Sequence, residues 1–171
     1  VQEFEKVCWE ARQKIKKLRL LETRRKMGTM YLADMFYHGG YAHLNNFNIT
    51  QCSPEHYAQI SGEKWSEFVA SVNGCHGCEV HCGHHYSIKS GPYAGLNAGG
   101  FEFGVSQAFN MWYGSPSLPF AAAVAHFCNE HGMDGSEPGM LLGWATDIFQ
   151  RGIITEKETG GLALSFGDEK V

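Results

Sequence analysis

Hydrophobic and polar positions follow a helical period over much of the chain. Near the start, apolar residues recur at steps of three and four while Lys and Arg fill the opposite face, which predicts an amphipathic helix over residues 2–20. Further helices are predicted over residues 28–37, from Ser53-Pro54, over 63–72, over 117–131 and from Ser136 to Gly152. The pattern therefore favours a mainly helical protein.

Local signals mark where several of these helices begin and end. Ser53 is expected to cap exposed amides while Pro54 occupies the first helical position, where its missing N–H does no harm. Gly39-Gly40 and Gly132 are expected to end their helices. In the last two helices, we expect the buried faces to consist of Phe120, Val124, Phe127 and Cys128 in one and of Met140, Leu141, Trp144 and Ile148 in the other.

The segments between the helices carry other signals. Residues 38–50, rich in Asn and aromatic residues, predict an ordered irregular loop, and residues 84–90 predict a short strand. Residues 92–104 are rich in glycine, so their backbone can approach a ligand closely. A turn at 155–158 and a short extended piece at 161–166 complete the prediction. The fold class is mainly α: an irregular helical domain over residues 1–171, with no internal repeat.

Composition limits the class of protein and its cellular location. A chain of 171 residues with 43% hydrophobic content is suited to one packed core. The formal net charge of -4 argues against nucleic acid as the main partner, although residues 14–26 are locally basic, a run that we interpret as a solvated helix face. No apolar stretch approaches the ~20 residues that a membrane span requires, and the first residues do not resemble a signal peptide. We therefore expect a soluble cytoplasmic protein.

The most specific motif is Cys75-His-Gly-Cys78-Glu-Val-His-Cys82. Four thiolates are the usual ligands of a 4Fe-4S cluster, and a short CxxCxxxC loop can supply three of them. Here the two-residue gap between cysteines comes before the three-residue gap, whereas the radical SAM signature has the three-residue gap first. The motif is therefore a poor match to radical SAM chemistry. The alternatives are a zinc site, disulfides or free thiols; the histidines that favour zinc are His76, His81, His84 and His85.

The chain ends carry a further prediction. The sequence begins without an initiator Met and stops within residues 167–171, where Asp168 and Glu169 are typical of the first turn of a helix. We therefore expect this chain to be a fragment of a longer protein. The fourth cluster ligand would then lie in sequence beyond it.

Together these motifs resemble the tungsten- or molybdenum-dependent aldehyde ferredoxin oxidoreductases over nearly the whole chain. The segments that carry the resemblance are Gly28-Thr29, Asn45-Asn46-Phe47, the three cysteines with Gly83, Cys128 to Asp134, Gly152 to Thr155 and Phe166 to Asp168. The resemblance implies that this chain is the central helical portion of a larger multidomain oxidoreductase. A pterin-binding N-terminal domain would precede it, and a C-terminal domain that supplies the fourth cysteine would follow.

The resemblance also implies cofactors and site residues. The cofactors are tungsten or molybdenum held by two pterins and a 4Fe-4S cluster with Cys75, Cys78 and Cys82 as ligands. Asp134 matches a residue that hydrogen-bonds a pterin; its alternative role is that of a turn or N-cap residue. Glu102, flanked by two aromatic residues, is the candidate catalytic proton acceptor during attack of water on a carbonyl. Its alternative is a surface carboxylate.

The function that the resemblance implies is oxidation of an aldehyde to a carboxylic acid in an anaerobic setting, with ferredoxin or another electron-transfer subunit as partner. A second reading is a benzoyl-CoA reductase-type catalytic subunit that reduces an aromatic acyl-CoA. A third is a non-catalytic module, either for electron transfer, with Cys52 as the fourth cluster ligand, or for zinc binding. A homodimer and a multi-subunit complex both remain open.

Overall fold

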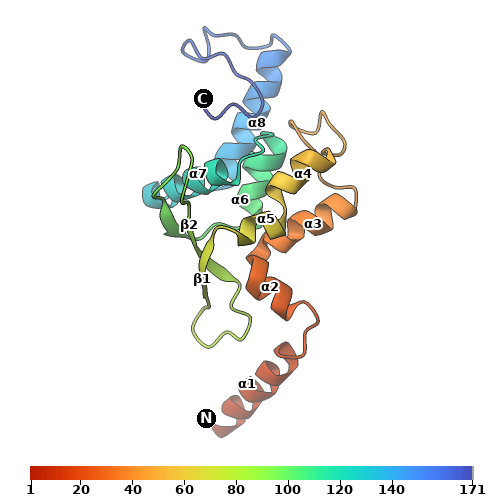
Figure 1. Ribbon diagram of the computed structural model, residues 1–171, viewed down its shortest axis with the longest axis vertical. Helices are drawn as coiled ribbons and strands as arrows, with labels where there is room; N and C mark the ends of the chain where they lie inside the picture. Colours follow the sequence, from red (N-terminus) through yellow and green to blue (C-terminus); the bar gives the residue numbers. More distant parts are fainter. Residues whose placement is uncertain (171) are drawn as a thin grey trace.

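The computed structural model describes residues 1–170 as a mainly helical, elongated molecule with one small sheet, so the predicted fold class is confirmed (Figure 1). The helices are α1 (Gln2–Ile15), α2 (Leu21–Met27), the 3-10 helix η1 (Gly28–Met30), α3 (Tyr31–His38), α4 (Pro54–Ile60), α5 (Gly62–Ser66), α6 (Phe103–Ser106), the π-helix η2 (Gln107–Trp112), α7 (Leu118–His131) and α8 (Glu137–Gln150). None of those in the described part of the chain has the length and apolarity that crossing a membrane requires.

Three antiparallel strands form the sheet, in the order β1 (Val69–Asn73), β2 (Gly83–Ser87) and β3 (Asn97–Gly99). The predicted helix over residues 63–72 is therefore wrong in its second half. Helix α5 ends at Ser66, and the following segment pairs with β2, where cross-strand hydrogen bonds replace those of a helix. The predicted strand at 84–90 corresponds to β2. The connection between β1 and β2 is the cysteine loop, which hangs from the sheet beside α2 (Figure 1).

The core lies between the sheet and the central helices. Trp65 of α5 is fully buried, and its ring lies 4.4 Å from that of Phe101 and 5.3 Å from that of Tyr86, centroid to centroid. Aromatic pairs at such separations add to the free energy gained from burial alone. This core fixes the sheet, and with it the base of the cysteine loop, against the helices.

Helix α1 differs from its prediction. It ends at Ile15 rather than near residue 20, and none of its residues is buried: Phe4 and Trp9 are 72% and 63% exposed. The helix projects from one end of the molecule (Figure 1). Farther along, the predicted helix at 28–37 is formed by η1 and α3, and it ends at Gly39-Gly40 as expected.

Helix α7 forms as predicted. The Ser117 hydroxyl accepts a hydrogen bond from the backbone N–H of Phe120, and Gly132 ends the helix in the left-handed conformation with φ of 68°. The predicted buried face is wrong at Phe127, which is 53% exposed. The predicted cap at Ser53, whose hydroxyl accepts from the N–H of His56, is confirmed.

Helix α8 packs with the opposite face from the one predicted. Its buried residues are Gly139, Gly143 and Thr146, whereas the residues of the expected buried stripe are partly or largely exposed. A Cβ atom at Gly139 would lie 2.7 Å from the Ala108 Cβ atom, and one at Gly143 would lie 2.9 Å from the Trp112 carbonyl oxygen. The two glycines allow α8 to approach η2 closely, and this contact turns the large apolar side chains outward.

The end of the chain is irregular. The turn at 155–158 is present, with the Glu158 carboxylate accepting the N–H and the hydroxyl of Thr155. Residues 161–166 form no strand, because they pair with no neighbouring segment of the described chain. The Asp168 carboxylate accepts the N–H of Lys170 within a turn. The helix predicted to start in residues 167–171 extends to Val171, which lies outside the described residues.

Candidate metal centre

The three cysteines of the motif and Glu102 line one hollow of about 290 Å³, here called the cysteine hollow. Its walls come from the end of β1, the cysteine loop, the start of β2, the end of β3 and the glycine-rich segment that follows. The lining residues are Asn73, Gly74, Cys75, Cys78, His81, Cys82, Gly83, His84, Gly99, Gly100 and Glu102. Four of the five predicted site residues therefore lie at the same place, although residue 102 is far from the cysteines in sequence.

Two left-handed residues bend the cysteine loop. Gly77 and His81 have φ of 70° and 55°, and the N–H of Cys78 donates to the carbonyl oxygen of Cys75. The N–H of Val80 donates to the Cys78 sulfur at 3.4 Å. N–H donors of this kind stabilise negative charge on sulfur.

The donor set suits an iron-sulfur cluster. All three cysteines are free thiols, with Cys75 exposed and the other two half-buried, and thiolates are the ligands that iron-sulfur clusters take. Over residues 1–170, no three Cys, His, Asp or Glu side chains lie close enough together to hold a metal ion between them.

The remaining cysteines lie elsewhere. Cys52 and Cys128 are 3% and 1% exposed, and burial raises the pKa of both thiols. Cys8 lies in α1. None of them lines the cysteine hollow. In particular, Cys52 packs in the hydrophobic core, where burial favours its neutral form.

His84, which could have bonded cluster sulfur, is held by the core instead. Its Nδ1 atom accepts a hydrogen bond from the Trp65 indole N–H at 3.1 Å, so the proton of the neutral ring lies on Nε2, which donates to the Arg25 carbonyl oxygen at 2.8 Å. Both ring nitrogens are thus used within the protein. His85 is exposed on β2.

Gly28 lets α2 and η1 pack directly against the cysteine loop. Its φ of 59° is in a region that side chains rarely adopt. A Cβ atom there would lie 2.9 Å from the Cys82 carbonyl oxygen and 3.1 Å from the His84 ring. The position of Cys82 therefore depends on the absence of a side chain at residue 28.

Thr29 positions Glu102. Its hydroxyl donates to the Glu102 carboxylate and accepts the N–H of Phe103 at 2.9 Å. Glu102 is half-buried, and its neighbours Phe101 and Phe103 are in the core. Glu102 thus lies on the wall of the hollow and is not a freely exposed carboxylate. Gly28-Thr29 is one of the segments that carry the family resemblance, but the sequence indicated no role for either residue.

Asp134 lies outside the cysteine hollow and acts as a cap. Its Oδ1 atom accepts the N–H groups of Ser136 at 2.7 Å and Glu137 at 3.3 Å, which is the arrangement expected for a residue before a helix. The loop is held against α6, since a Cβ atom at Gly135 would lie 2.9 Å from the Val105 side chain. The Asp134 charge also adds to burial in raising the pKa of the Cys128 thiol.

Comparison with known proteins connects this chain to a family. The family model described as "Aldehyde ferredoxin oxidoreductase, domains 2 & 3" matches residues 6–171. An aliphatic sulfonate oxidoreductase, WOR-like subunit, from Pyrococcus furiosus is 34% identical over 97 residues, which cover 56% of this chain and 15% of that protein.

Two further relatives are named tungsten-containing aldehyde ferredoxin oxidoreductases. The protein from Pyrococcus furiosus is 25% identical over 135 residues, and that from Pyrococcus horikoshii is 27% identical over 136 residues. The matches cover 79% and 80% of this chain and 22% of each relative. The chain thus spans about a fifth of the length of these relatives.

Proposed function

Because the chain belongs to the aldehyde ferredoxin oxidoreductase family, we propose that it is the central, cluster-bearing domain of a tungsten- or molybdenum-pterin enzyme. The reaction is oxidation of an aldehyde and water to a carboxylic acid, with release of two protons and two electrons. Each electron reduces one ferredoxin. Residues 1–171 form one helical domain of this enzyme, and the N-terminal pterin domain and the C-terminal domain lie outside it.

One observation carries the proposal: three cysteine thiols and a positioned carboxylate line the same hollow. Cys75, Cys78 and Cys82 bind iron of the cluster, and a residue outside this chain supplies the fourth ligand. When bound, the cluster stores and releases one electron at a time. The N–H of Val80 beside the Cys78 sulfur stabilises the negative charge of that ligand.

Glu102 accepts the proton of the attacking water. The Thr29 hydroxyl holds one carboxylate oxygen, so the side chain is fixed before substrate arrives. The buried rings of Phe101 and Phe103 anchor the backbone on both sides. A fixed carboxylate is suited to act as a general base toward water.

Asp134 binds a pterin while it caps α8. Its Oδ1 atom accepts the N–H groups of Ser136 and Glu137 at the start of the helix, and its Oδ2 atom forms no hydrogen bond within residues 1–170. The free oxygen is available to accept an N–H group of the pterin ring. The two roles are compatible, because each uses a different carboxylate oxygen.

Substitution of the cysteines tests the cluster. In the full-length protein purified without oxygen, Cys75→Ser is expected to lower the iron and sulfide content and the broad visible absorption. Cys8→Ser is the control, because Cys8 lies away from the hollow. Cys52→Ala is expected to retain the cluster; loss of iron in that variant would instead favour the electron-transfer module with Cys52 as a ligand.

Glu102→Gln tests the catalytic role. The amide keeps the size of the side chain and a hydrogen-bonding oxygen but cannot accept the proton. Turnover with an aldehyde and a redox dye is expected to fall at least tenfold, by general-base reasoning, while iron and tungsten contents stay unchanged. Unchanged turnover with intact metals would eliminate Glu102 as the base.

A second candidate function is oxidation or reduction of an aliphatic sulfonate, which is favoured by the match to the sulfonate oxidoreductase subunit at 34% identity. Dye-linked assays with an aldehyde and with an alkyl sulfonate discriminate the two. A third assay, acyl-CoA-dependent oxidation of a reduced donor, tests the benzoyl-CoA reductase-type reaction. Activity with the aldehyde alone supports the main proposal.

A further inference from the structure

Positive charge is concentrated in one short part of the chain. Residues 12–26, here called the basic segment, contain eight of the fourteen Lys and Arg residues and, at Glu22, one of the eighteen acidic residues. The remaining sequence is strongly acidic by the same count. The protein as a whole has a net charge of -4, so the basic segment is a local field of opposite sign.

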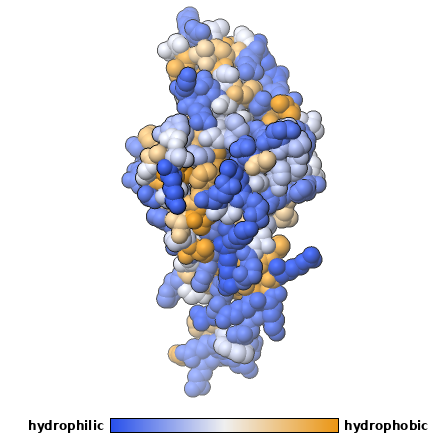
Figure 2. Space-filling view, viewed as in Figure 1, coloured by the Kyte–Doolittle hydropathy of each residue, from blue (hydrophilic) through white to orange (hydrophobic). Residues whose placement is uncertain are grey.

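Most of these basic side chains are exposed to solvent, and five of the eight form no ion pair within residues 1–170. Of the basic residues, Arg25 is half-buried and the other seven are exposed. The ion pairs of the segment involve Lys16, Arg25 and Lys26. Within residues 1–170, ion pairs are absent at Arg12, Lys14, Lys17, Arg19 and Arg24. Figure 2 shows that the lower end of the molecule, which carries this segment, is largely hydrophilic.

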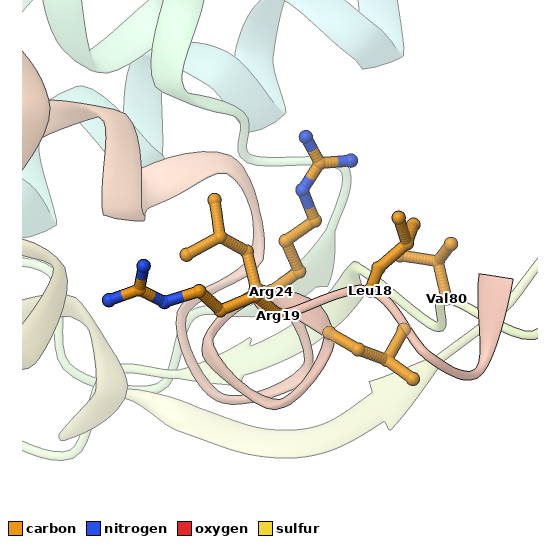
Figure 3. A pocket seen from close by; sticks show the side chains of 6 residues that line it. Leu18, Arg19, Arg24 and Val80 are labelled. Atoms are coloured by element: carbon orange, nitrogen blue, oxygen red, sulfur yellow. The ribbon is translucent and has the colours of Figure 1, made fainter. Parts of the chain in front are cut away.

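An apolar notch lies within this field. A cavity of about 290 Å³ is lined by Leu18, Arg19, Leu20, Leu21, Arg24 and Val80 and is here called the basic notch. In Figure 3 the side chains of Leu18 and Val80 lie side by side, and the guanidinium groups of Arg19 and Arg24 extend away from them in different directions. An apolar centre with a charged rim is the usual arrangement of a protein-binding surface.

The notch adjoins the candidate cluster. Val80 lies between Cys78 and Cys82 in the cysteine loop. Two contacts hold the loop to the basic segment: Lys16 pairs with the Glu79 carboxylate at 3.5 Å, and Arg25 donates to the Glu79 carbonyl oxygen at 2.9 Å. A molecule bound in the notch would therefore contact the loop that holds the cluster.

We propose that the basic notch is the docking site for an acidic one-electron carrier protein, an inference that rests on the proposed function. Carboxylates of the carrier pair with Arg19 and the neighbouring lysines, and an apolar side chain enters between Leu18 and Val80. A cluster held by the cysteine loop would supply one electron to the oxidised carrier at each docking event, so a two-electron turnover would require two such events. Complementary charge accelerates such encounters, and electron-transfer complexes need only a small interface.

Charge reversal in the full-length enzyme tests the inference. The test variant is Lys17→Glu/Arg19→Glu. The matched control is Lys89→Glu/Lys157→Glu, which makes the same change in net charge at exposed residues outside the segment. The rate constant for reduction of an acidic ferredoxin at low salt, its Kd by calorimetry and turnover with a small neutral redox dye are measured for each.

The expected result is a fall of about tenfold or more in the ferredoxin rate constant and a weaker Kd for the test variant, with dye turnover within twofold of the wild type. The control variant should lose less than threefold, and added salt should slow the wild type more than the test variant.

Equal rates with ferredoxin in the test variant and the wild type, while both reduce the dye, would overturn the docking site but leave the proposed function intact. A loss of dye turnover in the test variant would also overturn it, because the basic segment would then pack against the rest of the enzyme. A wild-type protein without cluster or dye turnover would refute the proposed function, and the docking site with it.

Discussion

The contact of Gly28 with the cysteine loop gives the sharpest test of how the helices support the candidate metal centre. In Gly28→Ala, a methyl group must occupy space 2.9 Å from the Cys82 carbonyl oxygen and 3.1 Å from the His84 ring. The backbone must also keep φ near 59°, which costs about 1–3 kcal/mol for a residue with a side chain. Overpacking adds about 1–3 kcal/mol.

We therefore expect Gly28→Ala to lower the free energy of unfolding by about 2–6 kcal/mol, the sum of these two contributions. Gly40→Ala is the matched control. Gly40 has φ of 78° but would place its Cβ atom in open space, so it carries only the backbone cost, about 1–3 kcal/mol. Denaturant unfolding gives both values, and iron content reports whether Cys82 has moved. If Gly28→Ala is no less stable than Gly40→Ala and retains its iron, the packing argument is refuted.

Three further predictions concern Glu102, Asp134 and the core. Thr29→Val keeps the shape of the side chain but removes its hydrogen bond to Glu102, which is worth about 1.5 kcal/mol. Dye-linked turnover should therefore fall about tenfold while the cluster stays intact. Full turnover would mean that Thr29 does not position the carboxylate. Asp134→Asn should retain the cap of α8 but lose pterin content, whereas Asp134→Ala should lose both; normal pterin content in the Asn variant would leave Asp134 as a cap alone. Burial raises the pKa of Tyr86 from 10.0 to about 12, so its contribution to stability is present below pH 10 and is lost as the pH rises from 10 to 12. Tyr86→Phe should therefore reduce the fall in melting temperature over that range, while the same change at exposed Tyr41 should not; equal curves for both variants would contradict the prediction.

Features that depend on neighbouring residues in the sequence were predictable. The cap at Ser53 and the left-handed Gly132 follow from the hydrogen-bonding needs of helix ends. The cysteine spacing likewise predicted a bent loop, and its three thiols line one hollow, although no three metal-binding side chains of residues 1–170 lie close enough together to hold a metal ion.

Features that depend on distant contacts were not predictable in the same way. Periodicity marks an apolar face on α8 but does not reveal that Gly139 and Gly143 fit against η2, so the predicted buried face was wrong. The segment after Ser66 becomes a strand because β2 is present to pair with it. The bond between Thr29 and Glu102 joins residues separated by 73 positions, and no local pattern indicates it.

Metal and sulfide analysis of the full-length protein, purified without oxygen, tests the central claim most directly. The account predicts four iron and four sulfide per chain, as a 4Fe-4S cluster requires, together with tungsten or molybdenum, and loss of that iron in Cys78→Ser. Stoichiometric zinc in a colourless protein without iron would contradict the cluster assignment, and iron without tungsten or molybdenum would contradict the pterin enzyme.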